Sequence, residues 1–306
     1  MNLYDYKFTP WREKDGKLVR SAESAWKKPT SWNRKAKDAR EIAEGQADAI
    51  TLIPARPRVL LTVDPFADVL QEWRDRLFAL MEEFRELDWV VVTERPEHVV
   101  KACGICCNIH GVPQHIFLGV KVRTQAEADR LIPELLRVPA KTRFVWVEPE
   151  EALDLSRWIR GRVLQTNDGR WLINTDPGAE SVGGTWLSGP NWIIVSGGTN
   201  PMHPEWVRAL RDQAKAASVP FWFDGWGEYT DMTNAEDGDT RFKKSTCDEI
   251  FTSTGEVLGA GYRHRRETNG MVDVNWKERG GAWMAKLGRK QSGRILDGRT
   301  HDGVPS

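Results

Sequence analysis

The stretch from Asn191 to Glu228 constrains the fold of this chain more than any other. It opens with Trp192-Ile-Ile-Val195, a short apolar and β-branched run that predicts a buried strand. A glycine-containing turn follows, and from Pro204 the apolar residues recur at the spacing of an amphipathic helix. A second apolar run, Val219–Phe223, completes a strand–turn–helix–strand unit. Because such units build parallel sheets with right-handed crossovers, the stretch predicts an α/β protein.

Similar units precede this one along the chain. The predicted strands are Val59–Val63, Trp89–Thr93, His115–Val122 and Arg143–Val147, and the predicted helices are Val69–Phe84 and Ala126–Leu136. About five or six units can be counted, which is close to but short of the eight of a complete barrel. The pattern therefore predicts a partial TIM-like (β/α) barrel with a parallel sheet.

Three stretches depart from this alternation and set the expected domain limits. Residues 160–176 contain Asn167-Asp168-Gly169 between two apolar runs, which predicts a β-hairpin inserted into the barrel. Residues 1–57 are poor in periodic signal, so we expect an N-terminal extension before a barrel at residues 58–228. Residues 229–306 are charged and glycine-rich, and we expect an irregular C-terminal extension that packs on the barrel.

The composition argues against several classes of partner. The 306 residues include 44 basic and 44 acidic side chains, so no overall charge attracts nucleic acid. The basic runs Arg263–Arg266 and Arg289–Arg299 could contact nucleic-acid phosphates, although such runs are usually solvated surfaces. Because no apolar run is long enough to span a bilayer and Met1–Lys17 is polar, we expect a cytoplasmic protein without a membrane partner.

The residues that follow the predicted strands are candidates for a ligand site, because parallel sheets bind ligands beyond the carboxyl ends of their strands. Six carboxylates fall there: Asp64, Asp68, Glu94, Glu148, Asp224 and Glu228. Paired carboxylates could bind a divalent ion or perform acid–base chemistry, whereas each alone could be a solvated loop acid or a helix cap. Glu94, Glu148 and Asp224 are predicted to be catalytic, and Asp64 and Glu228 to bind ligand.

The turn Ser196-Gly197-Gly198-Thr199-Asn200 leads from a strand into a helix and has the form of an anion site. Exposed amides and the positive end of a helix favour phosphate or carboxylate, and the glycines are expected at positive φ. His203 beside the turn is a titratable catalytic candidate, with helix capping as the alternative. Trp226 lies between two glycines and could stack on a base or sugar, with core packing as the alternative.

A cysteine cluster suggests a second kind of site. Cys103, Cys106, Cys107 and His110 place three thiols and an imidazole within eight positions, which could hold zinc or an iron–sulfur cluster. The spacing matches no common zinc finger, and the segment precedes a strand, away from the expected site. Buried, reduced cysteines in an irregular loop are the alternative.

Short motifs follow one another in a fixed order from about Trp26 to Thr300. They are Trp26–Pro29, Trp32–Ala36, Asp64–Phe66, Thr93–Glu97, Leu118–Val120, Ala128–Arg130, Ile132-Pro133, Glu148-Pro149, Pro201–Arg208, Trp226–Glu228, Gly293-Arg294 and Leu296–Thr300. Together they resemble a phage-associated family of unknown function that is related to radical S-adenosylmethionine proteins. Many spaced motifs in one order are more specific than any single one.

This resemblance implies a TIM-like fold and an S-adenosylmethionine site, but the chain departs from the family pattern. The family carries an N-terminal three-cysteine motif for an iron–sulfur cluster, whereas Met1–Lys28 contains no cysteine. Glu94 stands where the family has a basic residue, and Asp224-Gly225 where it has Lys-Gln; the glycine turn is shortened around Thr199-Asn200. Carboxylates in place of lysines would change what the site binds.

Two functions follow as hypotheses. The first is a diverged radical-SAM-like phage protein that binds a nucleotide or S-adenosylmethionine-like ligand at the strand ends and modifies nucleic acid or nucleotides. The second is a non-catalytic pseudoenzyme, a binding or scaffold protein that lost the cluster and acts with a partner chain. Either would work in the cytoplasm, that of the host cell if the chain is phage-encoded.

Overall fold

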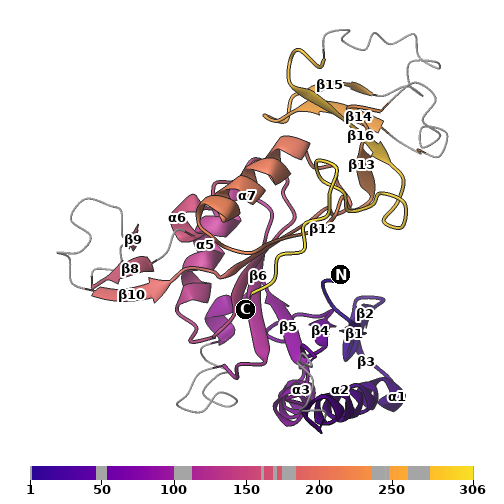
Figure 1. Cartoon of the computed structure of the whole chain (residues 1–306), viewed down its shortest axis with the longest axis vertical. Helices are drawn as coiled ribbons and strands as arrows, with labels where there is room; N and C mark the ends of the chain where they lie inside the picture. The colour runs from indigo at the N-terminus through magenta and orange to yellow at the C-terminus, as the bar shows by residue number, and fades with distance from the viewer. Residues whose placement is uncertain are drawn as a thin grey trace. The chain divides into compact units, whose positions relative to one another are not determined.

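Seven strands of the computed structural model lie in the order β1-β4-β5-β6-β7-β11-β12 (Figure 1). They are β1 (Tyr6–Phe8), β4 (Arg58–Leu61), β5 (Asp88–Thr93), β6 (Ile116–Val122), β7 (Arg143–Val147), β11 (Trp192–Ser196) and β12 (Phe221–Gly225). The pairings β1·β4, β4·β5, β5·β6 and β11·β12 are parallel. The predicted fold class, an α/β protein of the partial-barrel kind, is confirmed.

The structure describes residues 2–45, 54–99, 112–159, 162–167, 171–173, 184–235, 245, 248–260 and 276–305. The chain forms two compact units. The first comprises Met1–Val120 and Glu134–Phe144, and the second comprises Lys121–Pro133 and Val145–Ser306. Among the described residues, no helix combines the length and the apolar character needed to cross a membrane.

The first unit has more regular structure near its N-terminus than the sequence predicts. Strand β1 joins the parallel sheet beside β4, and it is followed by a hairpin of β2 (Trp11–Lys14) and β3 (Lys17–Arg20). Helices α1 (Glu23–Trp26) and α2 (Lys28–Gly45) come before β4, and α3 (Gln71–Glu83) comes after it. In the core, the ring of Phe8 packs at an angle against Trp26 and Trp89, with centroids 5.6 and 6.0 Å away.

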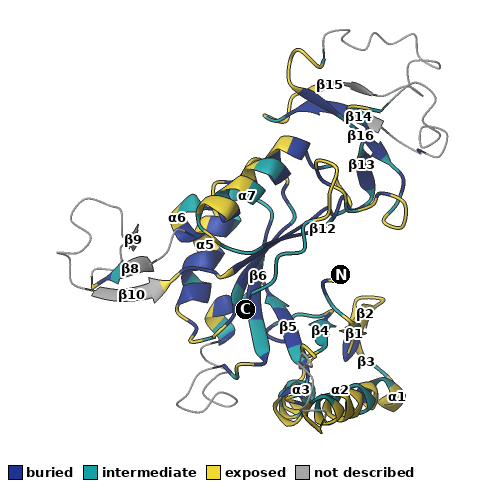
Figure 2. Ribbon diagram, in the orientation of Figure 1, coloured by how far each residue is buried: buried dark blue, intermediate teal, exposed yellow. Residues whose placement is uncertain are grey.

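In the second unit, α7 (Pro204–Ala216) connects β11 to β12. The residues that it buries include Trp206, Val207, Leu210 and Ala214, which are the predicted apolar face. All five residues of β11 are buried, because this strand lies inside the sheet. Helix α7 carries both buried and exposed residues (Figure 2), as an amphipathic helix should. Helices α5 (Gln125–Leu136) and α6 (Ser156–Ile159) precede β11 in the chain.

The predicted hairpin insertion is confirmed and is larger than expected. Strands β8 (Arg162–Thr166) and β9 (Trp171–Ile173) pair antiparallel, and β10 (Gly184–Ser188) pairs with β8 on its other side. The residues Asp168-Gly169 of the predicted turn lie outside the described residues.

The C-terminal part is only partly irregular. Strands β13 (Tyr229–Asp231), β14 (Asp248–Thr252), β15 (Val257–Ala260) and β16 (Gly281–Lys286) form an antiparallel sheet in the order β13-β16-β14-β15. The chain after β16 then follows β12 without regular structure, as expected. Phe223 N donates to His301 O and Gly303 N to Phe221 O, each at 3.0 Å.

Candidate functional site

The backbones that follow β11 and β12 come into direct contact. Gly197 N donates a hydrogen bond to Gly225 O at 2.7 Å. A Cβ added to Gly197 would lie 2.0 Å from the carbonyl oxygen of Trp226, and one added to Gly227 would lie 2.4 Å from Gly198 O. Real Cβ atoms do not approach so closely, so both glycines are required by the close approach of two chains.

The expectation of positive φ at Gly197 and Gly198 is wrong. Positive φ occurs instead at Gly225 (133°) and Gly227 (75°), on the opposite strand end. The first strand end therefore needs glycine for space, whereas the second needs it for both space and backbone conformation.

Glu148 lies beside the glycine turn. Its backbone N, just after β7, donates to Val122 O at 3.0 Å. Its Oε2 atom lies 2.7 Å from Lys121 Nζ and 3.4 Å from the position of a Cβ built on Gly198. The structure thus brings together two predicted site elements, Glu148 and the glycine turn, and adds a lysine that neutralises the carboxylate.

The last three residues of the turn present backbone N–H groups. Thr199 and Asn200 are exposed and Gly198 is half-buried. Within the described part of the chain, no group accepts a hydrogen bond from these three amides. Amides in such an arrangement can donate to an anionic oxygen. Because the Gly197 amide is already bonded, the predicted anion site is limited to residues 198–200.

Two predicted ligand-binding residues of this region face the protein interior. Ser196 is 6% exposed, and its Oγ accepts a hydrogen bond from Trp146 Nε1 at 2.8 Å. Trp226 is 3% exposed, and its Nε1 donates to Ile295 O at 2.9 Å. The ring of Phe223 packs edge-on against Trp226, with centroids 5.0 Å apart. The open stacking face expected for Trp226 is therefore absent, and core packing describes the residue.

His203 is buried as the N-cap of α7. Its Nδ1 accepts from Glu205 N, and its Nε2 donates to Gly280 O, both at 3.2 Å. This pairing requires the neutral imidazole with its proton on Nε2. Burial lowers the pKa of His203, in agreement with that form. Helix capping, the alternative considered for His203, is thus its structural role.

Asp224 and Glu228 flank the end of β12. The register with β11 shifts between Val195 and Ser196, which makes Asp224 the extra residue of a β-bulge. Bulges redirect side chains and are common beside binding sites. Glu228 forms an ion pair with Lys286 Nζ at 2.8 Å, and this hydrogen-bonded ammonium lowers the pKa of Glu228.

Asp64 and Glu94 belong to the first unit, where they meet after β4 and β5. Asp64 Oδ1 accepts from Phe66 N at 2.9 Å. Asp64 Oδ2 accepts from Thr93 Oγ1 at 2.9 Å and from Glu94 N at 3.1 Å. Both carboxylate oxygens of Asp64 therefore tie two strand ends together, while the side chain of Glu94 is exposed.

The predicted cysteine site, at Cys103, Cys106, Cys107 and His110, lies outside the described residues and stays a prediction. Among the residues that are described, no three His, Cys, Asp or Glu side chains are grouped so that they could hold a metal ion.

Sequence reasoning missed three side chains of this region: Lys121, Trp146 and Lys286. Lys121 lies at the end of a predicted strand, so the strand-end rule would have found it if it had been applied to basic as well as acidic residues. Trp146 and Lys286 carry no such signal, because their partners Ser196 and Glu228 are far away in the sequence.

Comparison with known proteins adds one match. A family model described as "Protein of unknown function (DUF5131)" matches residues 2–305, and this range includes every site residue named above. No curated protein and no solved structure matches the chain.

Proposed function

The chain belongs to the DUF5131 family, whose function is unknown; from this premise we propose that its second unit binds an S-adenosylmethionine- or nucleotide-like ligand. The site is the strand-end region of β7, β11 and β12. The observation that carries this proposal is the row of amides at residues 198–200 beside the Lys121–Glu148 pair. These amides would donate to a carboxylate or phosphate, and Glu148 would accept from a ribose hydroxyl or an ammonium group.

The local charges favour a zwitterionic ligand over a polyphosphate. Three carboxylates, on Glu148, Asp224 and Glu228, lie at or just after the ends of β7 and β12. Lys121 pairs with Glu148, Lys286 pairs with Glu228, and Arg289 also acts on Glu228. A triphosphate would compete with these carboxylates for the same cations and would be repelled by the carboxylates themselves. S-adenosylmethionine carries one carboxylate together with an ammonium and a sulfonium group, so its charges match both the amides and the acids.

The resemblance to a phage-associated radical-SAM family supports the same ligand class, with nucleic-acid or nucleotide modification as the proposed context. The N-terminal segment does not fit an iron–sulfur cluster. Met1–Lys28 contains no cysteine, and Arg20 and Glu23 of this segment form an ion pair at 2.9 Å. This segment therefore offers no thiolate ligand to such a cluster.

A non-catalytic binding or scaffold protein that acts with a partner chain is the second candidate. The burial of His203 favours it, because this imidazole was one of the four predicted catalytic side chains and both of its nitrogens are bonded within the protein. A retained ligand site without an exposed imidazole suits recognition better than acid–base catalysis.

The test is a thermal-shift and calorimetric titration with S-adenosylmethionine, S-adenosylhomocysteine and ATP. We expect S-adenosylmethionine to stabilise the protein, by about 2.7 kcal/mol at a hundredfold excess over Kd, and to bind more tightly than ATP. Glu148→Gln should weaken this binding about tenfold, because it removes the negative charge and replaces one of two acceptor oxygens with an NH2 donor.

Glu150→Gln is the matched control, because Glu150 is an exposed carboxylate two positions away and should leave the affinity unchanged. Tighter binding of ATP than of S-adenosylmethionine would contradict the charge argument. Indifference to all three compounds would leave the scaffold function as the better proposal.

A further inference from the structure

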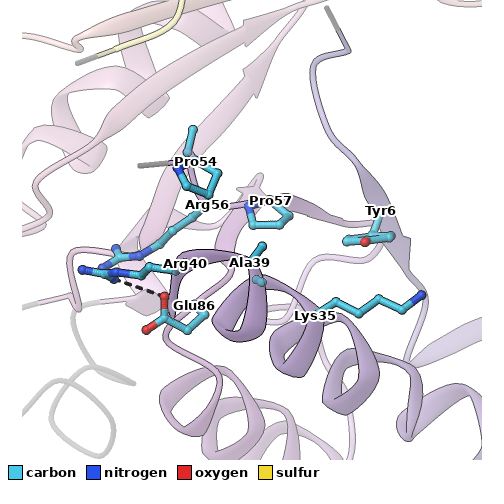
Figure 3. A pocket seen from close by; sticks show the side chains of 10 residues that line it. Tyr6, Lys35, Ala39, Arg40, Pro54, Arg56, Pro57 and Glu86 are labelled. Atoms are coloured by element: carbon cyan, nitrogen blue, oxygen red, sulfur yellow. Dashed lines mark hydrogen bonds and ion pairs between the residues drawn. The ribbon is translucent and has the colours of Figure 1, made fainter. Parts of the chain in front are cut away.

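The first unit contains a pocket that the proposed function does not use. This cavity of about 180 Å³ is lined by residues of β1, α2 and the segment 54–57, together with Glu86 (Figure 3). All of its lining residues belong to the first unit. It is therefore a separate candidate site, and its chemistry can be read from its own lining.

The charged lining of the pocket is mainly cationic. Lys35, Arg40 and Arg56 contribute three positive charges, and Glu86 contributes one negative charge. Arg40 is shared between Glu86, at 3.2 Å, and a carboxylate of its own helix, at 2.9 Å. Arg56 approaches Asp88 only to 3.7 Å, which is longer than a hydrogen bond. Lys35 has no hydrogen-bond or ion-pair partner within the described residues.

The two ends of the pocket differ in character. Figure 3 shows the side chains of Arg40 and Arg56 reaching the same end, where Arg40 meets Glu86, and Tyr6 with Lys35 at the other. The space between them is bordered by small or apolar residues, with Ala39 and Pro57 among them. The pocket is thus polarised, with paired guanidinium groups at one end and an aromatic ring at the other.

The aromatic end is fixed in place. The ring of Tyr6 stacks on that of Trp32 with centroids 4.4 Å apart and planes 4° from parallel. A ring held in this way presents a defined flat border to a ligand at little cost in conformational entropy. The volume suffices for one ring, since a cavity of roughly 150 Å³ binds benzene in another protein.

We propose that this pocket binds a small organic anion with a flat, apolar body, of the class of aromatic carboxylates and aryl phosphates. The acidic group lies against Arg56 and Arg40, because guanidinium groups pair with carboxylate and phosphate through two parallel hydrogen bonds. The body lies along Ala39 and Pro57 and extends toward Tyr6. A neutral ligand of the same shape loses the ionic pairing, and inorganic phosphate loses the apolar contact.

Benzoate and phenyl phosphate are the probes, titrated into the full chain by calorimetry. Both should bind with a Kd of about 1 mM or tighter, and benzyl alcohol and inorganic phosphate at least about tenfold more weakly. Arg56→Gln should weaken benzoate about fivefold or more, because it removes a guanidinium group. Glu86→Gln should strengthen it several-fold, because Glu86 is the one acidic residue among the described residues of the lining.

Ala39→Leu should abolish binding by filling the space, and it is expected to fold because Ala39 is exposed on α2. Two exposed positions of the same unit outside the pocket serve as controls, Asp38→Leu for added bulk and Arg12→Gln for a lost charge. Three results would each overturn the proposal: no binding of either probe at about 10 mM, equal binding of benzyl alcohol, or affinities unaffected by Ala39→Leu and Arg56→Gln. Binding of S-adenosylmethionine to the second unit is measured separately, so failure of one site leaves the other intact.

Discussion

Gly197 occupies a point where two backbones are too close for any side chain. The turn after β11 contacts the turn after β12, with Gly197 N bonded to Gly225 O and the Trp226 carbonyl against the Gly197 Cα. At such a crossing the neighbour is main chain, which cannot move aside as the tip of a long side chain can. Because Gly197 has only a hydrogen atom in place of a side chain, the two strand ends can approach this closely.

We predict that Gly197→Ala destabilises the protein by about 2–4 kcal/mol, because the added methyl group must displace backbone. Gly45→Ala is the matched control, since a Cβ at Gly45 meets no described atom within 4 Å and its φ is not positive. That change should be neutral or slightly stabilising. Urea unfolding of both variants measures the difference, and equal midpoints would refute the importance of the crossing.

At the scale of the element, the buried face of α7 could be predicted from the sequence, whereas the role of its capping residue could not. The apolar spacing predicted its buried face correctly, because residues three to four positions apart in one short segment lie on the same face of a helix. The local sequence did not decide the role of His203. A histidine before a helix can cap it or face a ligand, and the choice depends on Gly280, which accepts its Nε2 proton from far along the chain.

The cap on α7 should make the protein sensitive to acid. The pKa of His203 is lowered in the folded state from 6.5, so the unfolded chain takes up the proton first. The stability that His203 contributes is therefore full above pH about 6.5 and is lost as the pH falls toward the folded pKa.

We predict that His203→Asn, which keeps a capping acceptor, lowers stability at pH 7.5 by roughly 1 kcal/mol through loss of the bond to Gly280. The difference in stability between His203→Asn and the wild type should become smaller as the pH falls from 7.5 to 5. His203→Ala should be less stable than His203→Asn at every pH, because it has no capping side chain. Thermal unfolding at several pH values measures this, and parallel curves for wild type and His203→Asn would show that the imidazole does not titrate with folding.

For the whole molecule, elements that are defined by neighbouring residues were predictable from the sequence, whereas those that depend on residues far away in the sequence were not. Strands β4 to β7 and β11 to β12 are dense apolar runs, so their existence was predictable. Strand β1 has only three residues and gains its place from β4. The ligand-stacking role proposed for Trp226 was wrong and its core-packing alternative was right. The flanking glycines could not decide between them, because they say nothing about Ile295, which accepts the indole N–H.

In the candidate site, too, the features that depend on local sequence were predictable and those that depend on distant residues were not. Glu148 and the glycine turn were placed together correctly, because the rule that ligands bind at the carboxyl ends of parallel strands depends only on recognising strands. The ion pair of Glu228 was not predictable, since Lys286 belongs to β16, a strand without a clear sequence pattern. The pocket beside Tyr6 was missed because its described lining comes from four separated segments: β1, α2, residues 54–57 and Glu86.

The first unit carries the opposite pH dependence in the half-buried carboxyl group of Asp88, at the start of β5. Burial raises the pKa of Asp88 to about 6, against the opposing effect of Arg56 and Arg58. The folded state thus holds this proton more tightly than the unfolded chain, whose ordinary pKa is 3.8. The stability that Asp88 contributes is full below pH 3.8 and is lost as the pH rises through about 6.

We therefore predict that the stability of Asp88→Asn relative to the wild type increases as the pH is raised from 4 to 8. The difference between their unfolding free energies should change by roughly 2–3 kcal/mol in favour of the variant. The amide resembles the protonated acid in shape and cannot ionise, so the variant avoids a buried charge at high pH. Asp38→Asn, at an exposed position of α2, should show no such trend. A constant difference between Asp88→Asn and wild type across this range would mean that Asp88 ionises equally easily in the folded and unfolded states, and that Arg56 and Arg58 fully offset its burial.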